Sequence, residues 1–301
     1  MGTPEFAVPS LEILIKNGFN VVAVVTAPDK PSGRGLKLTP SPVKLVAHEH
    51  NIPVLQPEKL KNPSFLAELA SYKANLQVVV AFRMLPEAVW NMPVYGTFNL
   101  HASLLPNYRG AAPINWAIIN GEKETGVTTF FLNHEIDTGD IIFQEKTPID
   151  PEENVESLYH RLMNMGAELV LKTVQNIQSD RITTSRQQPD TQCKPAPKIF
   201  KEDCKIDFSA TAPEVKNFIR GLAPYPAAWT TLAGKHFKIL AAEIVSSVSG
   251  QLSGIDPAYS TNNKDCLLLH TRDGAVSVKE LQMEGKKRMT IEEFFRGNKL
   301  S

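Results

Sequence analysis

The sequence predicts an α/β protein in which a doubly wound, mostly parallel sheet is followed by a smaller, β-rich domain. Short apolar runs alternate with helical patterns over residues 1–180, a polar, proline-rich stretch follows at 181–203, and short β-like runs dominate residues 204–301. Parallel strands need long crossover connections, which are usually helices, so this alternation indicates a parallel sheet. We therefore expect a first domain at 1–180, a linker at 181–203 and a second domain at 204–301.

The alternation is clearest in the first half of the chain. Residues 11–16 form a short amphipathic pattern that is closed by Asn17-Gly18, as at a helix end. The all-apolar run at 21–25 predicts a strand that is buried on both faces. Further helices are expected at 64–72 and 112–119, and further strands at 77–82, 96–101, 126–132 and 141–149.

A long helix is expected from about Pro151 to Ile177. Asp150 is its expected N-cap, Pro151 would occupy the first helical position, and Glu153 would complete an arrangement like a capping box. The stretch at 181–203 then resembles a semi-rigid, extended linker, because it is polar and rich in proline.

The last segment of the chain predicts one helix and several short strands. The helix is expected at 212–222, and β-like runs separated by turn signals occur at 227–232, 236–245, 266–269 and 275–281. Several short strands at this spacing are typical of a small β-rich domain.

Composition narrows the class of protein. The 301 residues include 42% hydrophobic and 21% charged residues and carry no net charge, so any nucleic-acid contact must depend on local basic patches. Three cysteines without metal-binding spacing, Cys193, Cys204 and Cys266, argue against a disulfide framework. No apolar run reaches the roughly 18 residues of a membrane span, and no signal peptide is recognisable. We expect a cytoplasmic protein without a bound metal.

The stretch 96–113 carries the first candidate chemistry. Asn99 and His101 are two residues apart, so on an extended strand they point to the same face. An apolar shelf of Leu104, Leu105 and Pro106 follows. An amide donor and an imidazole beside an apolar surface suit acyl chemistry on a flat, apolar cofactor. The same two polar groups also fit a purely structural role at a strand end.

A second polar segment ends the next apolar run. Residues 127–132 lead into Asn133-His134-Glu135-Ile136-Asp137-Thr138-Gly139-Asp140. In open α/β sheets, ligands bind outside the carboxyl ends of the strands. We therefore expect Asp137 to face His101.

A loop at 29–42 contains several basic residues. Lys30, Arg34, Lys37 and Lys44 occur with no acidic residue between the first and the last of them. A solvated surface loop is one interpretation, and contact with nucleic-acid phosphates is the other. The basic cluster at 286–288 likewise fits a solvated turn.

On these residues the chain resembles the methionyl-tRNA formyltransferase family of folate-dependent enzymes. The similar motifs are Asn99-Leu-His101, Ser103-Leu-Leu-Pro106, Arg109-Gly-Ala-Ala-Pro113, Asp137-Thr-Gly-Asp140, the first ten residues, the loop at 33–37 and the segment at 282–296. The resemblance covers essentially the whole chain. The Asn-x-His and Asp set is shared by all folate-dependent formyltransferases, whereas the basic loop and the C-terminal segment are more specific.

The resemblance implies a fold, a reaction and a set of residues. The fold is a Rossmann-like formyltransferase domain followed by an OB-like barrel that binds tRNA. The reaction moves a formyl group from 10-formyltetrahydrofolate to the amino group of methionyl-initiator tRNA, without a metal and in a protein that is expected to be a monomer. The implied catalytic residues are Asn99, His101 and Asp137, the implied folate-lining residues are Ser103, Leu104, Leu105 and Pro106, and the implied tRNA contacts are Lys30, Arg34 and Lys37.

The chemistry of these side chains agrees with that reaction. Attack of an amine on the formyl carbon places negative charge on the carbonyl oxygen, to which Asn99 can donate a hydrogen bond. His101 can act as a general acid or share this stabilisation. Asp137 can orient the imidazole or hold a water that relays a proton, and the sequence leaves both roles open.

Two other functions compete with this one. A folate-dependent formyltransferase for a small amine would share the Asn99, His101 and Asp137 pattern, but the nucleotide-precursor enzyme of this kind lacks the basic loop and the second domain. A tRNA-binding protein that has lost catalysis would not need the intact pattern. A dinucleotide site is not expected, since no G-x-G-x-x-G follows a strand.

The start of the sequence carries one further expectation. Met1-Gly2-Thr3-Pro4 reads as a turn into a helix, whereas members of the family begin with a short apolar strand before this turn. In a doubly wound sheet that strand is central, so its absence would leave two neighbouring strand edges unpaired. We expect the natural coding frame to begin a few residues earlier.

Overall fold

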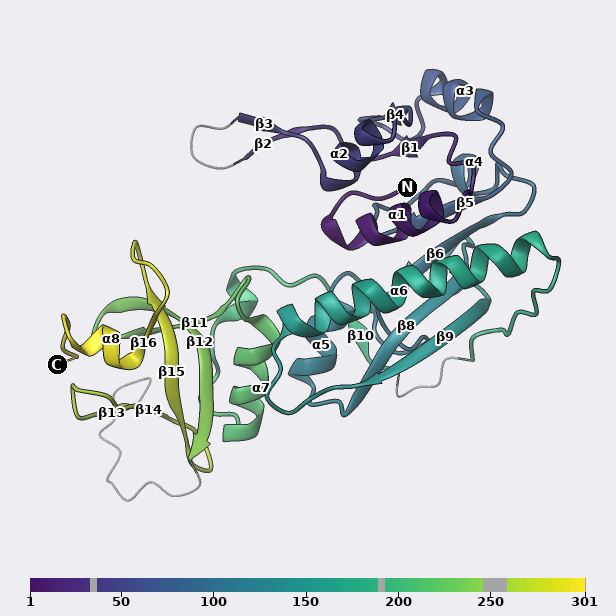
Figure 1. The fold of residues 1–301 in the computed structure, drawn as a ribbon. Helices are drawn as coiled ribbons and strands as arrows, with labels where there is room; N and C mark the ends of the chain where they lie inside the picture. The colour runs from purple at the N-terminus through teal and green to yellow at the C-terminus, as the bar shows by residue number, and fades with distance from the viewer. Residues whose placement is uncertain (33–36, 189–192, 246–258, 301) are drawn as a thin grey trace. The chain divides into compact units, whose positions relative to one another are not determined.

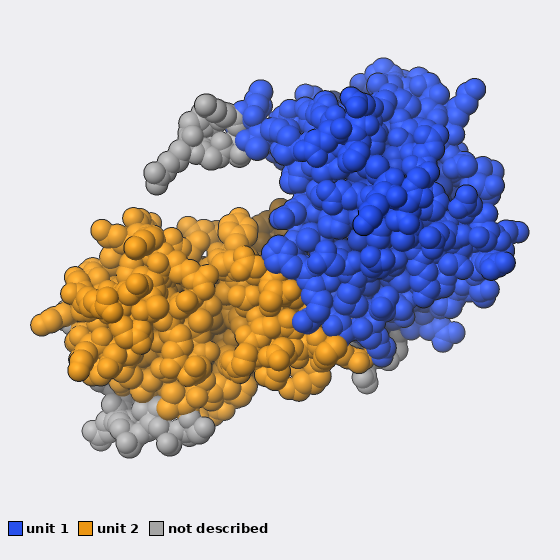
Figure 2. All heavy atoms as spheres, viewed as in Figure 1, with its two compact units in different colours: residues 1–110, 126–147, 159–195 blue, residues 111–125, 148–158, 196–301 orange. Residues whose placement is uncertain are grey.

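The computed structural model describes residues 1–32, 37–188, 193–245 and 259–300 (Figure 1). The chain divides into two compact units (Figure 2). Unit 1 comprises residues 1–110, 126–147 and 159–195, and unit 2 comprises residues 111–125, 148–158 and 196–301.

The strands of unit 1 confirm the predicted α/β class. Its larger sheet has the order β5 (Gln77–Val80), β6 (Thr97–His101), β8 (Glu124–Phe131) and β9 (Ile141–Pro148). Strands β5 and β6 are parallel, and β8 runs antiparallel to β6. A second parallel pair consists of β1 (Val24–Val25) and β4 (Val54–Leu55). A hairpin of β2 (Lys30–Ser32) and β3 (Lys37–Thr39) carries the basic loop.

The helices of unit 1 are η1 (Glu5–Ala7), α1 (Val8–Lys16), α2 (Pro42–Glu49), α3 (Pro63–Ser71), α4 (Glu87–Trp90) and the long α6 (Val155–Gln178). Two of them, α2 and α3, begin where the sequence supplies both proline and a capping side chain. The side chains of Ser41 and Asn62 accept backbone N–H groups at the starts of α2 and α3. Gly166 of α6 faces Leu100 of β6, and a Cβ atom would approach the leucine side chain to 2.6 Å. The small residue therefore lets the helix lie close to the strand.

The predicted start of the long helix is wrong by about one turn. The Asp150 N–H does donate to the Glu153 carboxylate at 2.7 Å, as a capping box requires, but this contact closes a turn that precedes the helix. The helix starts at Val155, and the side chain of Asn154 accepts the Ser157 N–H at 3.1 Å. Two capping motifs follow each other in the sequence, and the second one starts the helix.

Unit 2 is built on a curled antiparallel sheet, consistent with an OB-like fold (Figure 1). The sheet order is β11 (Ala228–Leu232), β12 (Lys235–Val245), β15 (Ala275–Met283), β14 (Leu267–His270) and β13 (Tyr259–Thr261), and β16 (Met289–Thr290) pairs with β15. Its helices are α5 (Pro113–Ile119), α7 (Ala212–Leu222) and α8 (Ile291–Phe295), with a short 3-10 helix η2 (Glu202–Cys204). Two short strands, β7 (Arg109–Gly110) and β10 (Pro195–Ala196), pair with each other. Apolar side chains of the sheet, α7 and α8 form one buried core, which includes Phe237, Ile219 and Phe294.

None of the helices in the described part of the chain combines the length and the apolar character that a membrane span requires.

The first two residues of the chain lie between β1 and β5. The α-amino group of Met1 donates to the Val78 carbonyl at 2.6 Å, the Val80 N–H donates to the Met1 carbonyl at 2.9 Å, and the Gly2 N–H donates to Val25 at 3.0 Å. Gly2 and Val80 form a parallel bridge. Residues 1 and 2 therefore pair as the last residues of a strand would.

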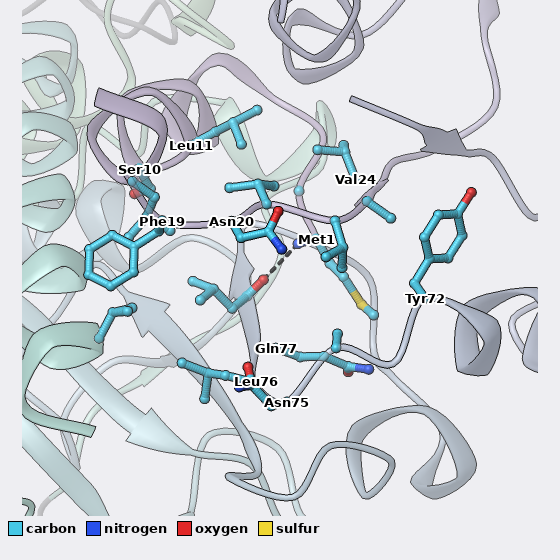
Figure 3. Close-up of a pocket in the computed structure, with 18 of the residues that line it drawn as sticks. Met1, Ser10, Leu11, Phe19, Asn20, Val24, Tyr72, Asn75, Leu76 and Gln77 are labelled. Atoms are coloured by element: carbon cyan, nitrogen blue, oxygen red, sulfur yellow. Dashed lines mark hydrogen bonds between the residues drawn. The ribbon is translucent and has the colours of Figure 1, made fainter. Parts of the chain in front are cut away.

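A cavity of about 510 Å³ continues from Met1 along these two strands (Figure 3). It is lined largely by apolar side chains of α1, of the segment 19–24 and of the segment 74–78. The predicted strand at 21–25 is shortened here to Val24–Val25, because residues 21–23 face this cavity. Burial of the Met1 amino group lowers its pKa from 8.0 to about 5.

The cavity predicts a response to an added segment. We expect an apolar extension of about five residues before Met1 to pair with β1 and β5 and to raise the thermal midpoint by several degrees. The measurement is thermal unfolding of the chain with and without the extension, and a glycine-serine extension of equal length is the control. Equal midpoints for the apolar and the glycine-serine extensions would contradict the expectation.

The buried amino group predicts a pH effect on stability. Between about pH 5 and pH 8 the unfolded chain holds a proton on Met1 that the folded chain does not, so the free energy of unfolding rises with pH. The slope from this one group is at most about 1.4 kcal/mol per pH unit. Unfolding at pH 5.5 and pH 7.5 should show a smaller pH dependence for the Nα-acetylated chain than for the free one. The same dependence in both would show that the amino group is solvated.

Candidate active site

The candidate site is formed where β6 ends. Asn99 pairs with Val79 of β5 and with Phe130 of β8, and His101 pairs with Thr128 of β8. The two side chains thus share one face of a strand that is held on both sides. His101 is buried and Asn99 is half-buried. Within the described part of the chain, the Asn99 side chain forms no hydrogen bond, which leaves its amide free to donate to a ligand.

The structure brings Asp137 to the imidazole of His101. The distance from Nδ1 of His101 to Oδ2 of Asp137 is 3.8 Å, and both side chains are largely buried. On the other side of the ring, Nε2 lies 2.8 Å from the carbonyl oxygen of Tyr108. A carbonyl oxygen only accepts, so Nε2 carries a proton and Nδ1 is the nitrogen that faces the carboxylate. A distance of 3.8 Å is longer than a hydrogen bond, so the carboxylate faces the ring without bonding to it directly.

Asp137 is held in an unusual backbone conformation. Its φ of +55° lies in the left-handed region, which costs on the order of 1–3 kcal/mol for a residue with a side chain. Its carboxylate accepts the N–H of Gly110 at 2.9 Å. Gly139 follows in the same turn, and a Cβ atom there would lie 1.6 Å from the Phe131 carbonyl oxygen. Only glycine fits at 139, so the turn closes tightly against β8.

Gln187, which lies in the predicted linker at 181–203, forms hydrogen bonds to the turn that contains Asp137. The side chain of Gln187 donates to the carbonyl oxygens of Asp137 at 2.9 Å and of Gly139 at 2.8 Å, and it accepts from the guanidinium of Arg109. It is buried, with 6% of its surface exposed. Nothing in the local sequence marks this glutamine, because its neighbours are polar and its partners lie 48 to 78 residues away.

The segment predicted to line the folate site is partly built into the core. The Ser103 hydroxyl donates to the Asn107 carbonyl at 2.7 Å, and Thr128 bonds both the Ser103 carbonyl and the Leu105 N–H. Ser103 and Leu105 are buried, whereas Leu104 and Pro106 are half-buried. Any apolar surface that this segment offers to a ligand therefore comes from Leu104 and Pro106.

Two of the three predicted tRNA contacts lie on the paired strands β2 and β3. Lys30 is exposed on β2, Lys37 starts β3, and Arg34 lies outside the described residues. Lys44, the fourth basic residue of this region, donates to Asp29 at 2.6 Å and to Gln56 at 2.7 Å. Lys44 thus anchors the base of the hairpin.

No group of three or more histidine, cysteine, aspartate or glutamate side chains in the described segments is arranged to hold a metal ion. The polar groups that the site does bring together are the amide of Asn99, the imidazole of His101 and the carboxylate of Asp137.

The chain matches two family models. Residues 1–174 match the model described as formyl transferase, and residues 198–299 match the model of the formyl transferase C-terminal domain. A methionyl-tRNA formyltransferase of Bacteroides thetaiotaomicron is 52% identical over 306 residues, which cover 100% of this chain and 95% of that protein. A methionyl-tRNA formyltransferase of Flavobacterium johnsoniae is 48% identical over 297 residues, covering 99% of this chain and 94% of the other.

The fold also resembles solved structures. One is a sugar 3N-formyl transferase crystallised in the presence of dTDP and 5-N-formyl-THF. The two folds agree with a TM-score of 0.68 over 95% of this chain and 97% of that one, at 23% sequence identity. At this identity the agreement concerns the fold alone.

Proposed function

The chain belongs to the formyl transferase family, and we propose that it transfers a formyl group to the amino group of methionyl-tRNA, the substrate named in its relatives. The observation that supports this function most strongly is the sequence identity of 52% and 48%, over nearly the whole chain, to two methionyl-tRNA formyltransferases. The same enzymes supply the formyl-methionine with which translation starts, so a role in translation initiation follows from the activity.

The formyl donor is of the folate type, and we propose that it is 10-formyltetrahydrofolate. When bound, such a donor supplies a formyl group on a nitrogen that can leave. The residues present fit this group, because a half-buried amide at Asn99 lies on the strand that leads into the half-buried apolar side chains of Leu104 and Pro106. A flat pteridine ring needs such an apolar surface together with a small number of polar groups.

Three side chains would act on the reacting atoms. As the amine attacks, negative charge grows on the formyl oxygen, and the Asn99 amide would donate a hydrogen bond to it. The His101 imidazole would supply or share a proton near this charge, and the Asp137 carboxylate would orient the ring, because it faces Nδ1 at 3.8 Å. The substrate supplies the attacking amine and the donor supplies the formyl group. The protein would contribute by positioning these two groups and by stabilising the charge that develops between them.

The two ends of the chain would have separate tasks. We propose that residues 1–180 carry out catalysis, that residues 181–203 act as a linker, and that the OB-like domain at 204–301 binds tRNA. The hairpin with Lys30, Arg34 and Lys37 would add contacts to phosphates of the initiator tRNA. The protein would act in the cytoplasm as a monomer.

The catalytic role of the imidazole gives a direct test. We expect His101→Ala to lower kcat for formylation of methionyl-initiator tRNA by about 10²-fold or more, while the affinities for tRNA and for the folate donor change little. His50→Ala, at an exposed histidine after α2, is the control and should keep full activity. Full turnover by His101→Ala would show that the imidazole does not take part.

The role of the basic hairpin is tested separately. We expect Lys30→Ala and Arg34→Ala each to raise KM for tRNA and to reduce the slope of log affinity against log salt by about one, without a change in folate binding. Lys59→Ala, at an exposed lysine elsewhere in unit 1, is the control. An unchanged KM for tRNA and an unchanged salt slope in both variants would show that the hairpin does not contact the tRNA.

A further inference from the structure

We propose that Gln187 is a positioning residue of the transfer reaction, which acts by holding Asp137 in place to face His101. The inference rests on the proposed function and adds to it a residue outside the predicted catalytic set. Gln187 touches no reacting atom in this arrangement. Its effect passes through the backbone of the turn that carries the carboxylate.

The side chain of Gln187 uses its full hydrogen-bonding capacity. Its NH₂ group donates to two carbonyl oxygens, those of Asp137 at 2.9 Å and Gly139 at 2.8 Å. Its oxygen accepts from two nitrogens of Arg109, Nε at 3.2 Å and Nη2 at 2.6 Å. Carbonyl oxygens only accept and a guanidinium only donates, so the orientation of the amide is fixed and no other side chain of similar size satisfies all four contacts.

These contacts join the two segments that form the surroundings of Asp137. One segment is the turn of Asp137 and Gly139, and the other is Arg109-Gly110. The N–H of Gly110 in that second segment holds the Asp137 carboxylate at 2.9 Å. Gln187 therefore holds the backbone of Asp137. It also holds Arg109, the residue next to the Gly110 whose N–H binds the Asp137 carboxylate.

The hydrogen bonds within the turn itself do not involve Asp137. The Phe131 N–H donates to the Asp140 carbonyl at 3.0 Å at the base of the turn, and the Asn133 side chain accepts from Glu135 and Thr138, whereas residues 133–136 are exposed. Asp137 itself has a left-handed φ of +55°, a conformation that costs energy for a residue with a side chain, although aspartate adopts it more often than most residues do. Two hydrogen bonds from a buried amide oppose relaxation of this residue, because loosening the turn would leave the amide buried without acceptors.

The chain delivers Gln187 to the site through a short backbone pairing. Ser185 exchanges two hydrogen bonds with Ile141 of β9, at 2.8 and 2.9 Å, directly after the turn that contains Gly139. Two residues later the Gln187 side chain is buried, whereas its neighbour Gln188 is exposed. The stretch that follows α6 is thus part of the site.

The experiment compares two variants with a matched neighbour. Gln187→Leu removes all four hydrogen bonds, and Gln187→Glu keeps the contact with Arg109 while it replaces the two donors with acceptors. We expect both to lower kcat about 10- to 100-fold, with less than threefold change in KM for tRNA or folate donor. Gln188→Leu should leave kcat unchanged. Full kcat in a folded Gln187→Glu or Gln187→Leu protein would overturn the proposal.

A double-mutant cycle separates positioning from a general structural effect. If Gln187 acts through Asp137, then Gln187→Leu should cost less than threefold in kcat when Asp137→Ala is already present. An additive loss would overturn the proposal. Should Gln187→Leu not fold, Gln187→Glu takes its place in the cycle, with the same expected result.

A measurement without substrate keeps this inference distinct from the proposed function. Amide hydrogen exchange of a peptide covering 133–140 should be at least tenfold faster in the Gln187 variants and unchanged in Gln188→Leu. Unchanged exchange would overturn the positioning role even in an active enzyme. Absence of formylation by the unmodified chain, together with faster exchange in the variants, would instead point to failure of the proposed function.

Discussion

The proposed mechanism depends on one arrangement, in which the carboxylate of Asp137 faces the imidazole of His101 from a turn where Asp137 has a left-handed backbone conformation. His101 ends a central strand that is paired on both sides, so its position follows from the sheet. Asp137 has no such support, and its φ of +55° is adopted at a local energetic cost. The contacts at Gly110 and Gln187 compensate for that cost. Loss of either one would release the carboxylate without disturbing the sheet.

The fixed carboxylate determines what the imidazole can do. With Nε2 bonded to the Tyr108 carbonyl, Nδ1 is the nitrogen of His101 that faces Asp137. The imidazole and the Asn99 amide lie together at the end of β6, where negative charge would develop on a formyl oxygen in the proposed mechanism. Strand β6 thus positions Asn99 and His101, and the turn after β8 contributes the carboxylate of Asp137.

Much of this arrangement could be predicted from the sequence, because it depends on short-range pattern. The two-residue spacing of Asn99 and His101 on an apolar run indicated a shared face, and the segment after β8 indicated a second polar strand end. Helix α7 was predicted at its observed bounds, and in the structure Thr211 and Glu214 form a capping box at its start. The predicted start of α6 was wrong, because two consecutive capping motifs could each begin the helix and the local sequence does not distinguish between them.

Long-range partners could not be predicted in this way. Gln187 lies in a polar stretch, and its role depends on backbone oxygens about 50 residues earlier, which no local pattern records. Strand β1 is shorter than its apolar run suggests, because pairing depends on what lies beside it. Ser103 and Leu105 belong to a recognisable motif, yet burial leaves mainly Leu104 and Pro106 to face a ligand.

The proposed function is tested most directly by a single-turnover assay of the purified chain with 10-formyltetrahydrofolate and methionyl-initiator tRNA. We expect N-formylmethionyl-tRNA to form and the folate donor to lose its formyl group in equal amount. Stable, salt-sensitive tRNA binding without a formylated product would contradict the proposed function and would favour a binding protein. Formylation of a small amine but not of the tRNA would show that the chain is a formyltransferase with a different acceptor.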